Sequence, residues 1–204
     1  MNEKIYHYPV WIRFWHWFNA LFCLGLIITG ISMQYADPES PFINFESAVK
    51  IHNVCGILLT FNYLLFFTGN FFSINGNHYN LRKGIFNRMV KQFRYYALGI
   101  FKGEKAPFPV NVTTKFNPLQ KFVYTLIMYV GVPVIILSGW ALLFPEIIIN
   151  QIFGISGVFL TDIVHVIFGF IISIFLVVHV YFCTLGLKVG SLFMSMINGW
   201  VKSH

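Results

Sequence analysis

The sequence predicts an all-α membrane protein, a bundle of four transmembrane helices. Of its 204 residues, 57% are hydrophobic and only 10% are charged, which lies outside the usual range of soluble domains. Four nearly uncharged segments each reach the length of about 20 residues that crosses a bilayer. They are Phe14–Met33, Ile51–Phe72, Phe122–Phe144 and Ile163–Gly186. The third observation is that basic residues gather in one loop.

Each helix has local signals at its start, and we expect helices at about 10–34, 47–72, 118–144 and 161–187. Pro9 favours the first turn of the first helix, and Ser47 begins the second. The third follows Asn117-Pro118 and contains Pro133, which neighbouring helices can accommodate in a membrane. Thr161-Asp162 is a plausible N-cap for the fourth. No repeat or low-complexity tract divides the chain, so we expect a single domain, residues 1–204.

Loop charge predicts the orientation of the bundle. The loop between the second and third segments carries nine basic residues against Glu104 alone, whereas the other two loops are acidic. By the positive-inside rule the basic loop is cytoplasmic, and so are the N and C termini. The net charge of +7 therefore reflects contact with membrane lipid, and we expect no nucleic acid partner. The nine basic residues are Arg82, Lys83, Arg88, Lys91, Arg94, Lys102, Lys105, Lys115 and Lys121.

Residues 84–101 of this loop mix bulky apolar side chains with basic ones. The pattern is typical of a basic helix lying on the anionic inner leaflet between helices two and three. A solvated basic connector is the alternative.

Four histidines fall within the apolar helices. His165 and His179 are 14 residues apart on one segment, which places both rings on nearly the same helical face, roughly 21 Å apart along the axis. With the orientation given by charge, His16 and His179 lie toward the inner side and His52 and His165 toward the outer side. Depth alone therefore pairs His52 with His165 and His16 with His179.

A metal ion held by two imidazoles needs further ligands, and a haem supplies four in a plane. We therefore expect two b-type haems, with these histidines as axial ligands of the iron. One turn after two of the ligands stand Gly56 and Gly169, small enough for a flat ring to pack against the helix. His7, His78 and His204 lie in polar flanks, and we expect them to be solvated.

Other interpretations of the intramembrane histidines remain open. Such residues also serve in packing or in proton relays, so a histidine-relay proton or ion transporter is one alternative function. A purely structural membrane anchor is another. A relay would be expected to use carboxylates deep in the membrane, and the four apolar segments contain none.

The sequence also resembles a known family. The run Arg13-Phe14-Trp15-His16-Trp17, followed by Thr29-Gly30, resembles the R-x-x-H-W … T-G signature of the bacterial four-helix dihaem cytochrome b family. The segment from His165 to His179 and the run from Asn117 to Lys121 are similar to further motifs of that family. Its members are membrane subunits of formate dehydrogenases, nickel–iron hydrogenases and thiosulfate-type reductases. The chain departs at Val166, where hydrogenase members often carry a basic residue.

The resemblance implies the same two haem pairs and a quinone pocket beside the inner haem. Asn117 and Gln120 would project into that pocket, although Asn117 is equally placed to cap a helix. Arg13 would pair with a haem propionate or extend to phospholipid.

We therefore expect an electron-transfer subunit of a respiratory oxidoreductase complex in the bacterial inner membrane. It would carry electrons between the quinone pool, menaquinone or ubiquinone, and a periplasmic iron–sulfur or multihaem cytochrome subunit that it also anchors. The chain itself has no soluble part that would act on another substrate, so any reaction of its own would take place at the quinone site.

Overall fold

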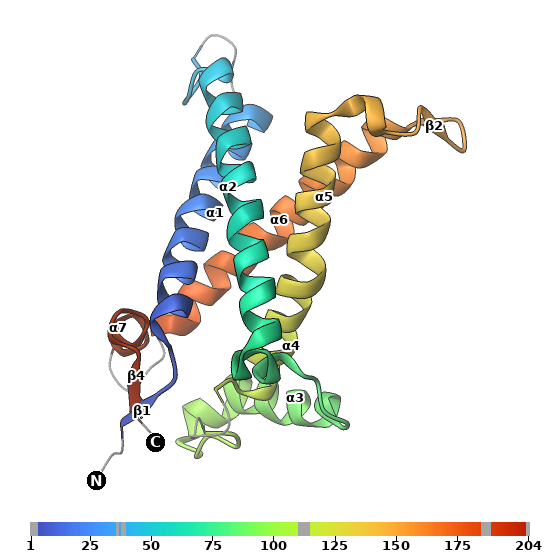
Figure 1. Ribbon diagram of the computed structural model, residues 1–204. Coiled ribbons are helices and arrows are strands. Elements are labelled where there is room, and N and C mark those ends of the chain that lie inside the picture. Colours follow the sequence, from blue (N-terminus) through green and yellow to red (C-terminus); the bar gives the residue numbers. More distant parts are fainter. Residues whose placement is uncertain (1–3, 36, 38–39, 110–114, 185–188, 203–204) are drawn as a thin grey trace. The chain divides into compact units, whose positions relative to one another are not determined.

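The computed structural model describes residues 4–35, 37, 40–109, 115–184 and 189–202. Within these residues the structure is all-α apart from two short pairs of strands, and four helical segments are long and apolar enough to cross a membrane (Figure 1). The membrane-spanning segments are α1 (Val10–Tyr35), α2 (Phe45–Phe72), α4 to α5 (Pro118–Leu143) and α6 (Gly157–Thr184). The predicted fold class of a four-helix membrane protein is confirmed.

Shorter elements connect and flank these spans. The strands are β1 (Lys4–Tyr6), β2 (Gln151–Ile152), β3 (Ile155–Ser156) and β4 (Trp200–Lys202), and the short α-helices are α3 (Ile85–Arg94) and α7 (Ser191–Asn198). The remaining helical turns are η1 (Ile74–Tyr79), η2 (Tyr95–Gly99), η3 (Ile100–Lys102) and η5 (Pro145–Ile147). The run α3–η2–η3 extends from Ile85 to Lys102, so the helix predicted for residues 84–101 is present there. Its position at the membrane surface stays a prediction.

The described chain groups into two compact units, each built from separate stretches of sequence. One unit comprises Met1–Arg13, Thr68–Val130 and Phe182–His204. The other comprises Phe14–Phe67 and Gly131–Tyr181 and contains all four intramembrane histidines. The expectation of a single domain stays a prediction.

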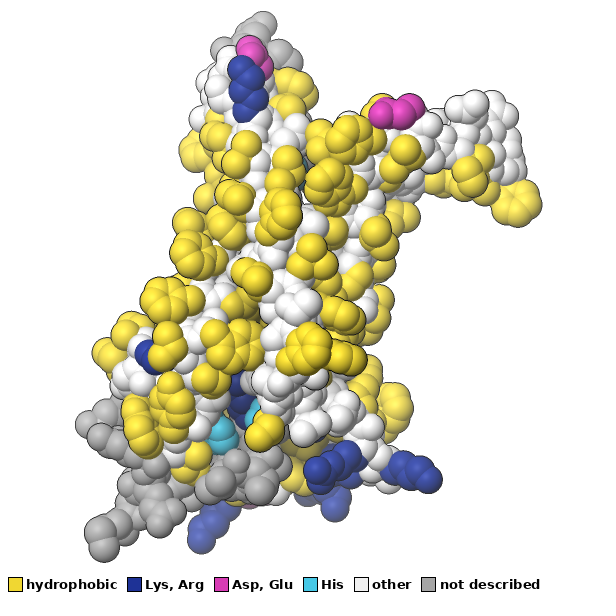
Figure 2. Space-filling view, viewed as in Figure 1, with side chains coloured by type: hydrophobic (Ala, Val, Ile, Leu, Met, Phe, Trp, Pro, Cys, Tyr) yellow, Lys and Arg dark blue, Asp and Glu magenta, His cyan; other side chains and the backbone are white. Residues whose placement is uncertain are grey.

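In the unit without the intramembrane histidines, strand β1 pairs antiparallel with β4, and Tyr6 lies opposite Trp200. Helix α3 packs against α4 (Pro118–Leu126), and the rings of Phe86 and Phe122 lie 5.9 Å apart. Lys and Arg side chains gather over α3 in Figure 2. This unit therefore carries the basic surface that the loop sequence predicts.

The distribution of polar and apolar side chains is that of a protein in lipid. Phe14, Leu137 and Val177 are each more than 60% exposed, whereas Thr29 and Ser138 are 2% and 7% exposed. Apolar side chains cover the visible faces of α2 and α5 (Figure 2). Lipid chains can solvate such a surface, while backbone and hydroxyl groups must be satisfied within the protein.

The third span contains a π-helical turn, η4 (Ile127–Gly131), which ends two residues before Pro133. A proline inside a helix removes one N–H and crowds the preceding turn. Local π adjustments are one way in which membrane helices accommodate it. The helix resumes as α5 (Val132–Leu143) and continues through Ser138.

Helix α6 begins one turn before the predicted start, so the expectation of an N-cap at Thr161-Asp162 was wrong. Its first residue is Gly157, whose N–H donates to the Asn150 carbonyl at 3.1 Å. The Thr161 hydroxyl donates back to the Gly157 carbonyl at 2.8 Å, inside the helix. The preceding β2–β3 hairpin positions this start, because it folds the chain back at Phe153 and Gly154, both at positive φ.

We predict that Gly157→Ala destabilises the protein by about 2 kcal/mol or more. A Cβ atom at Gly157 would lie 1.8 Å from the Ile149 carbonyl oxygen, so the backbone would have to move. Gly154→Asn is the matched control, because no atom lies within 4 Å and asparagine tolerates a φ of 81°. Thermal unfolding of the detergent-solubilised protein measures both, and equal midpoints for the two variants would contradict this role of Gly157.

Candidate functional site

Helix α6 carries two of the four intramembrane histidines in one uninterrupted helix. At 1.5 Å per residue, the 14 residues between His165 and His179 correspond to roughly 21 Å along its axis. The ring of His179 stacks on Phe175, one turn earlier, with centroids 5.7 Å apart and planes inclined by 28°. The helix therefore fixes the separation of two sites.

Two other helices bring a second imidazole to each of these residues. The ring centroids of His52 on α2 and His165 are 6.2 Å apart, and those of His16 on α1 and His179 are 6.1 Å apart. The structure thus brings together the two pairs that depth alone suggested. All four residues belong to the same compact unit.

The separation within each pair fits one metal ion between two imidazoles. Bonds from imidazole nitrogen to a metal are about 2 Å long, so rings on opposite sides of an ion have centroids roughly 6 Å apart. Either pair would leave four positions around the ion for other ligands, which a haem macrocycle supplies. The residues present therefore fit a bis-histidine haem.

Hydroxyl side chains on neighbouring helices contact the outer pair. Thr29 Oγ1 on α1 lies 2.9 Å from His52 Nδ1, and Ser138 Oγ on α5 lies 3.0 Å from His165 Nδ1. In the sequence Thr29 is notable only as part of the Thr29-Gly30 motif, and Ser138 was not predicted as a site residue. A signal existed, because each hydroxyl residue is followed directly by glycine, Gly30 and Gly139.

Indole and amide groups join the helices that carry the ligands. Trp15 Nε1 on α1 donates to the Asn62 carbonyl of α2 at 3.0 Å, and Asn62 Nδ2 donates to the Trp15 carbonyl at 3.3 Å. Trp140 Nε1 on α5 donates to Thr60 Oγ1 of α2 at 3.0 Å. These bonds hold α1 and α5 against α2 near the histidine pairs.

The predicted packing glycines each have room for a methyl group. A Cβ at Gly56 would lie 4.0 Å from Leu26 Cδ2, and one at Gly169 would lie 3.7 Å from Ile135 Cδ1. These are ordinary van der Waals distances, so neither glycine is required by its protein neighbours. Their role in haem packing stays a prediction.

Arg13, the predicted propionate or lipid partner, donates from its guanidinium to the Ile197 carbonyl in α7. This bond lies within the unit that holds both chain ends. The guanidinium has five donors, so it retains others for an anion. Pairing with a propionate stays a prediction.

Asn117 and Gln120, the predicted quinone residues, form a capping box at the start of α4. Asn117 Oδ1 accepts from the Gln120 N–H at 2.9 Å, and Gln120 Oε1 accepts from the Asn117 N–H at 3.2 Å. Asn117 Nδ2 donates to the Tyr96 hydroxyl at 2.9 Å. The cap that the sequence offered as an alternative is therefore present, and the quinone role stays a prediction.

Lys115, counted in the sequence among the basic loop residues, is 5% exposed. Its Nζ donates to Asn75 Oδ1 at 3.1 Å and lies 4.4 Å from the centroid of the Tyr8 ring. Burial of the ammonium group lowers the pKa of Lys115 to about 8. Burial of the phenol raises the pKa of Tyr8 to about 12. An ionisable cluster therefore lies beside the capping box.

The three remaining histidines do not share one environment. His7 is 8% exposed, so the expectation that it is solvated was wrong. His78 is partly buried. Its burial and, to a smaller extent, the positive charge of Lys115 lower the pKa of His78 to about 4. His204 lies outside the described residues.

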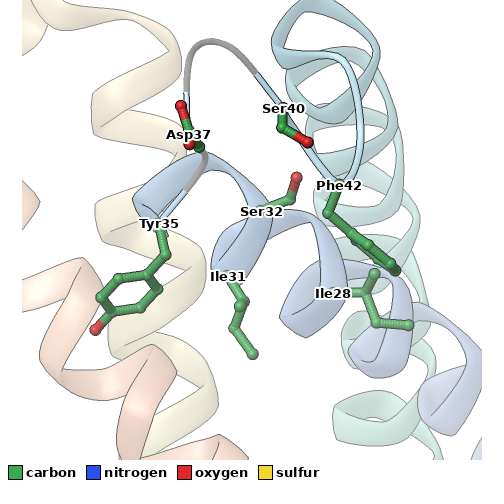
Figure 3. Close-up of a pocket in the computed structure, with 7 residues that line it drawn as sticks. All are labelled: Ile28, Ile31, Ser32, Tyr35, Asp37, Ser40 and Phe42. Atoms are coloured by element: carbon green, nitrogen blue, oxygen red, sulfur yellow. The ribbon is translucent and has the colours of Figure 1, made fainter.

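A pocket of about 400 Å³ lies at the end of α1 and the loop that follows it (Figure 3). Its lining includes Ile28, Ser32, Tyr35 and Phe42. Ser32 Oγ on α1 connects the helix to the loop, because it accepts a hydrogen bond from the Ile43 N–H at 3.2 Å and lies 3.3 Å from the Ile43 carbonyl oxygen. By the predicted topology this pocket faces outward.

Apolar spans with paired internal imidazoles are the features of a membrane cytochrome. The family model described as prokaryotic cytochrome b561 matches residues 7–199, and the chain therefore belongs to this family. It is also 37% identical over 200 residues to the "Putative cytochrome YdhU" of Escherichia coli (strain K12), covering 98% of this chain and 75% of that protein. No solved structure matches the chain.

The family and the fold together establish the general class of this protein. It is a b-type haem electron-transfer protein of a bacterial membrane cytochrome b family. Its four membrane-capable helices make it a multi-pass protein of the inner membrane.

Substitutions at Asn117 distinguish the helix cap from a quinone contact. Asn117→Ala removes the cap acceptor and is expected to cost about 1 kcal/mol of stability, measured by thermal unfolding. Asn117→Asp keeps the acceptor and should retain stability, but it cannot donate to a quinone carbonyl. If quinol reduces the haem of Asn117→Asp at the wild-type rate, Asn117 does not donate a hydrogen bond to the bound quinone.

Proposed function

We propose that this chain is a dihaem electron-transfer subunit that connects the quinone pool to a periplasmic redox partner. His52 and His165 would hold the outer haem, and His16 and His179 the inner one. When bound, the two haems would supply two one-electron carriers at different depths of the membrane. The observation that carries the proposal is the pair of centroid distances, 6.2 and 6.1 Å, at two depths along α6.

The surrounding residues support this role by positioning and shielding the ligands. Helix α6 sets the spacing, and the bonds from Trp15 and Trp140 to α2 keep the other helices in place. The apolar outer surface keeps the unit in lipid and excludes water from the ligands.

Quinone exchange is proposed for the cytoplasmic side, at the segment that contains Asn117 and Gln120. Menaquinone and ubiquinone both have carbonyls that accept hydrogen bonds, so the segment does not select between them. The partner is proposed to be an iron–sulfur or multihaem cytochrome subunit that docks on the short outer loops.

Histidine substitutions test the proposed pairs through the haem content of the purified protein. His52→Ala and His165→Ala should each lose half of the b-type haem, and the variant with both changes should lose no more than that half. Combining His52→Ala with His16→Ala should abolish haem binding, because one ligand of each pair is gone. His78→Ala is the control and should retain the full haem content.

The spectra of the single variants give a second measurement. The haem that remains in His52→Ala should be the one lost in His16→Ala, so the two difference spectra should sum to that of the wild type. Haem retained in the combined His52→Ala and His16→Ala variant would contradict the pairing.

A further inference from the structure

The two hydroxyl groups beside the outer histidine pair make the same set of hydrogen bonds. Besides its contact with His52, Thr29 Oγ1 donates to the Gly25 carbonyl, four residues earlier, at 2.7 Å. Besides its contact with His165, Ser138 Oγ donates to the Val134 carbonyl, also four residues earlier, at 2.8 Å. Helices α1 and α5 thus each place a hydroxyl group, bonded to its own helix backbone, beside one histidine of the outer pair.

This arrangement favours one position for the imidazole proton. A hydroxyl has one hydrogen, and in Thr29 and Ser138 we assign it to the backbone carbonyl, which lies 2.7 and 2.8 Å away. The hydroxyl oxygen can then only accept at the histidine, so Nδ1 of His52 and of His165 must be the N–H donor. The lone pair of each ring is therefore on Nε2, the form that binds a metal ion.

The glycine after each hydroxyl residue lies beside the same imidazole. A Cβ at Gly30 would lie 3.6 Å from His52 Cε1, and a Cβ at Gly139 would lie 3.2 Å from His165 Cε1. The first distance is an ordinary contact, whereas the second is tighter than most real Cβ contacts. Each ring therefore lies against a helix surface without a side chain, and a methyl group at Gly139 would require the His165 ring to shift by a few tenths of an ångström.

We propose that Thr29-Gly30 and Ser138-Gly139 are positioning pairs for the outer haem. In each pair the hydroxyl sets the tautomer of the imidazole, and the glycine leaves room for the imidazole ring against the helix. This inference rests on the proposed ligation by His52 and His165. A hydrogen bond from Nδ1–H raises the basicity of Nε2, which favours ferric over ferrous iron. The two hydroxyls therefore lower the reduction potential of the outer haem.

Thr29→Val tests the hydroxyl, because valine has nearly the same shape and no acceptor. In redox titrations of the full-length protein we expect the ferric-to-ferrous ratio of the outer haem at fixed potential to fall about threefold. For a one-electron couple this is an upward shift of about 30 mV. The inner haem should be unchanged, and Ser138→Ala should shift the same haem in the same direction.

Thr29→Ser is the matched control, since serine retains the acceptor and should keep the wild-type potential. If Thr29→Val loses the outer haem, haem content restored in Thr29→Ser also supports the inference. A full haem content with an unchanged potential in Thr29→Val, or an equal shift in Thr29→Ser, would overturn it. Such a result leaves the proposed function intact if His52→Ala still loses half of the haem.

The glycines allow a separate comparison. Gly139→Ala places a methyl group 3.2 Å from His165 Cε1 and should reduce occupancy of the outer haem by at least twofold. Gly30→Ala places it 3.6 Å from His52 Cε1, an ordinary contact distance, and should lower the haem content less than Gly139→Ala does. Pyridine haemochrome assays measure both, and equal haem content in the two variants would show that Gly139 does not receive the ring.

Discussion

A histidine inside a membrane needs partners for both ring nitrogens, because lipid chains offer none. In the outer pair, Nδ1 is bonded to Thr29 or Ser138, and each of these hydroxyls is bonded in turn to its own helix. Imidazole, hydroxyl and backbone carbonyl are therefore hydrogen-bonded to one another within the protein. This requirement explains why Thr29 and Ser138 are among the buried polar side chains of this unit.

The spans were predictable because length and hydrophobicity are local properties of the sequence. The four helices extend over nearly the residues expected, and loop charge with depth was enough to suggest which histidines meet. The start of α6 was not predictable in the same way. It depends on a carbonyl of Ile149 approaching Gly157 and on the hairpin turn at Phe153, whose positive φ is rare for a phenylalanine.

The polar residues near the basic loop show a second limit of the sequence. Lys115 is one of nine similar basic residues in that loop, and only packing shows that it is buried beside Asn75 and Tyr8. Asn117 suited either a cap or a quinone contact, and its bonds to Gln120 identify the cap. Residue type limits what such groups can do, but their neighbours determine which role they have.

The proposed ligation also bears on how the helices associate. Lipid chains are as apolar as the helix surfaces, so helices in a membrane have little hydrophobic tendency to pack, and polar contacts and metal bonds matter more. Here α6 carries one ligand of each pair, while α1 and α2 carry the others. Each haem would therefore join α6 to a different helix, and the bonds from Trp15 and Trp140 would join α1 and α5 to α2. Binding of the cofactor and assembly of this unit are then linked, because the two ligands of each iron lie on separate helices.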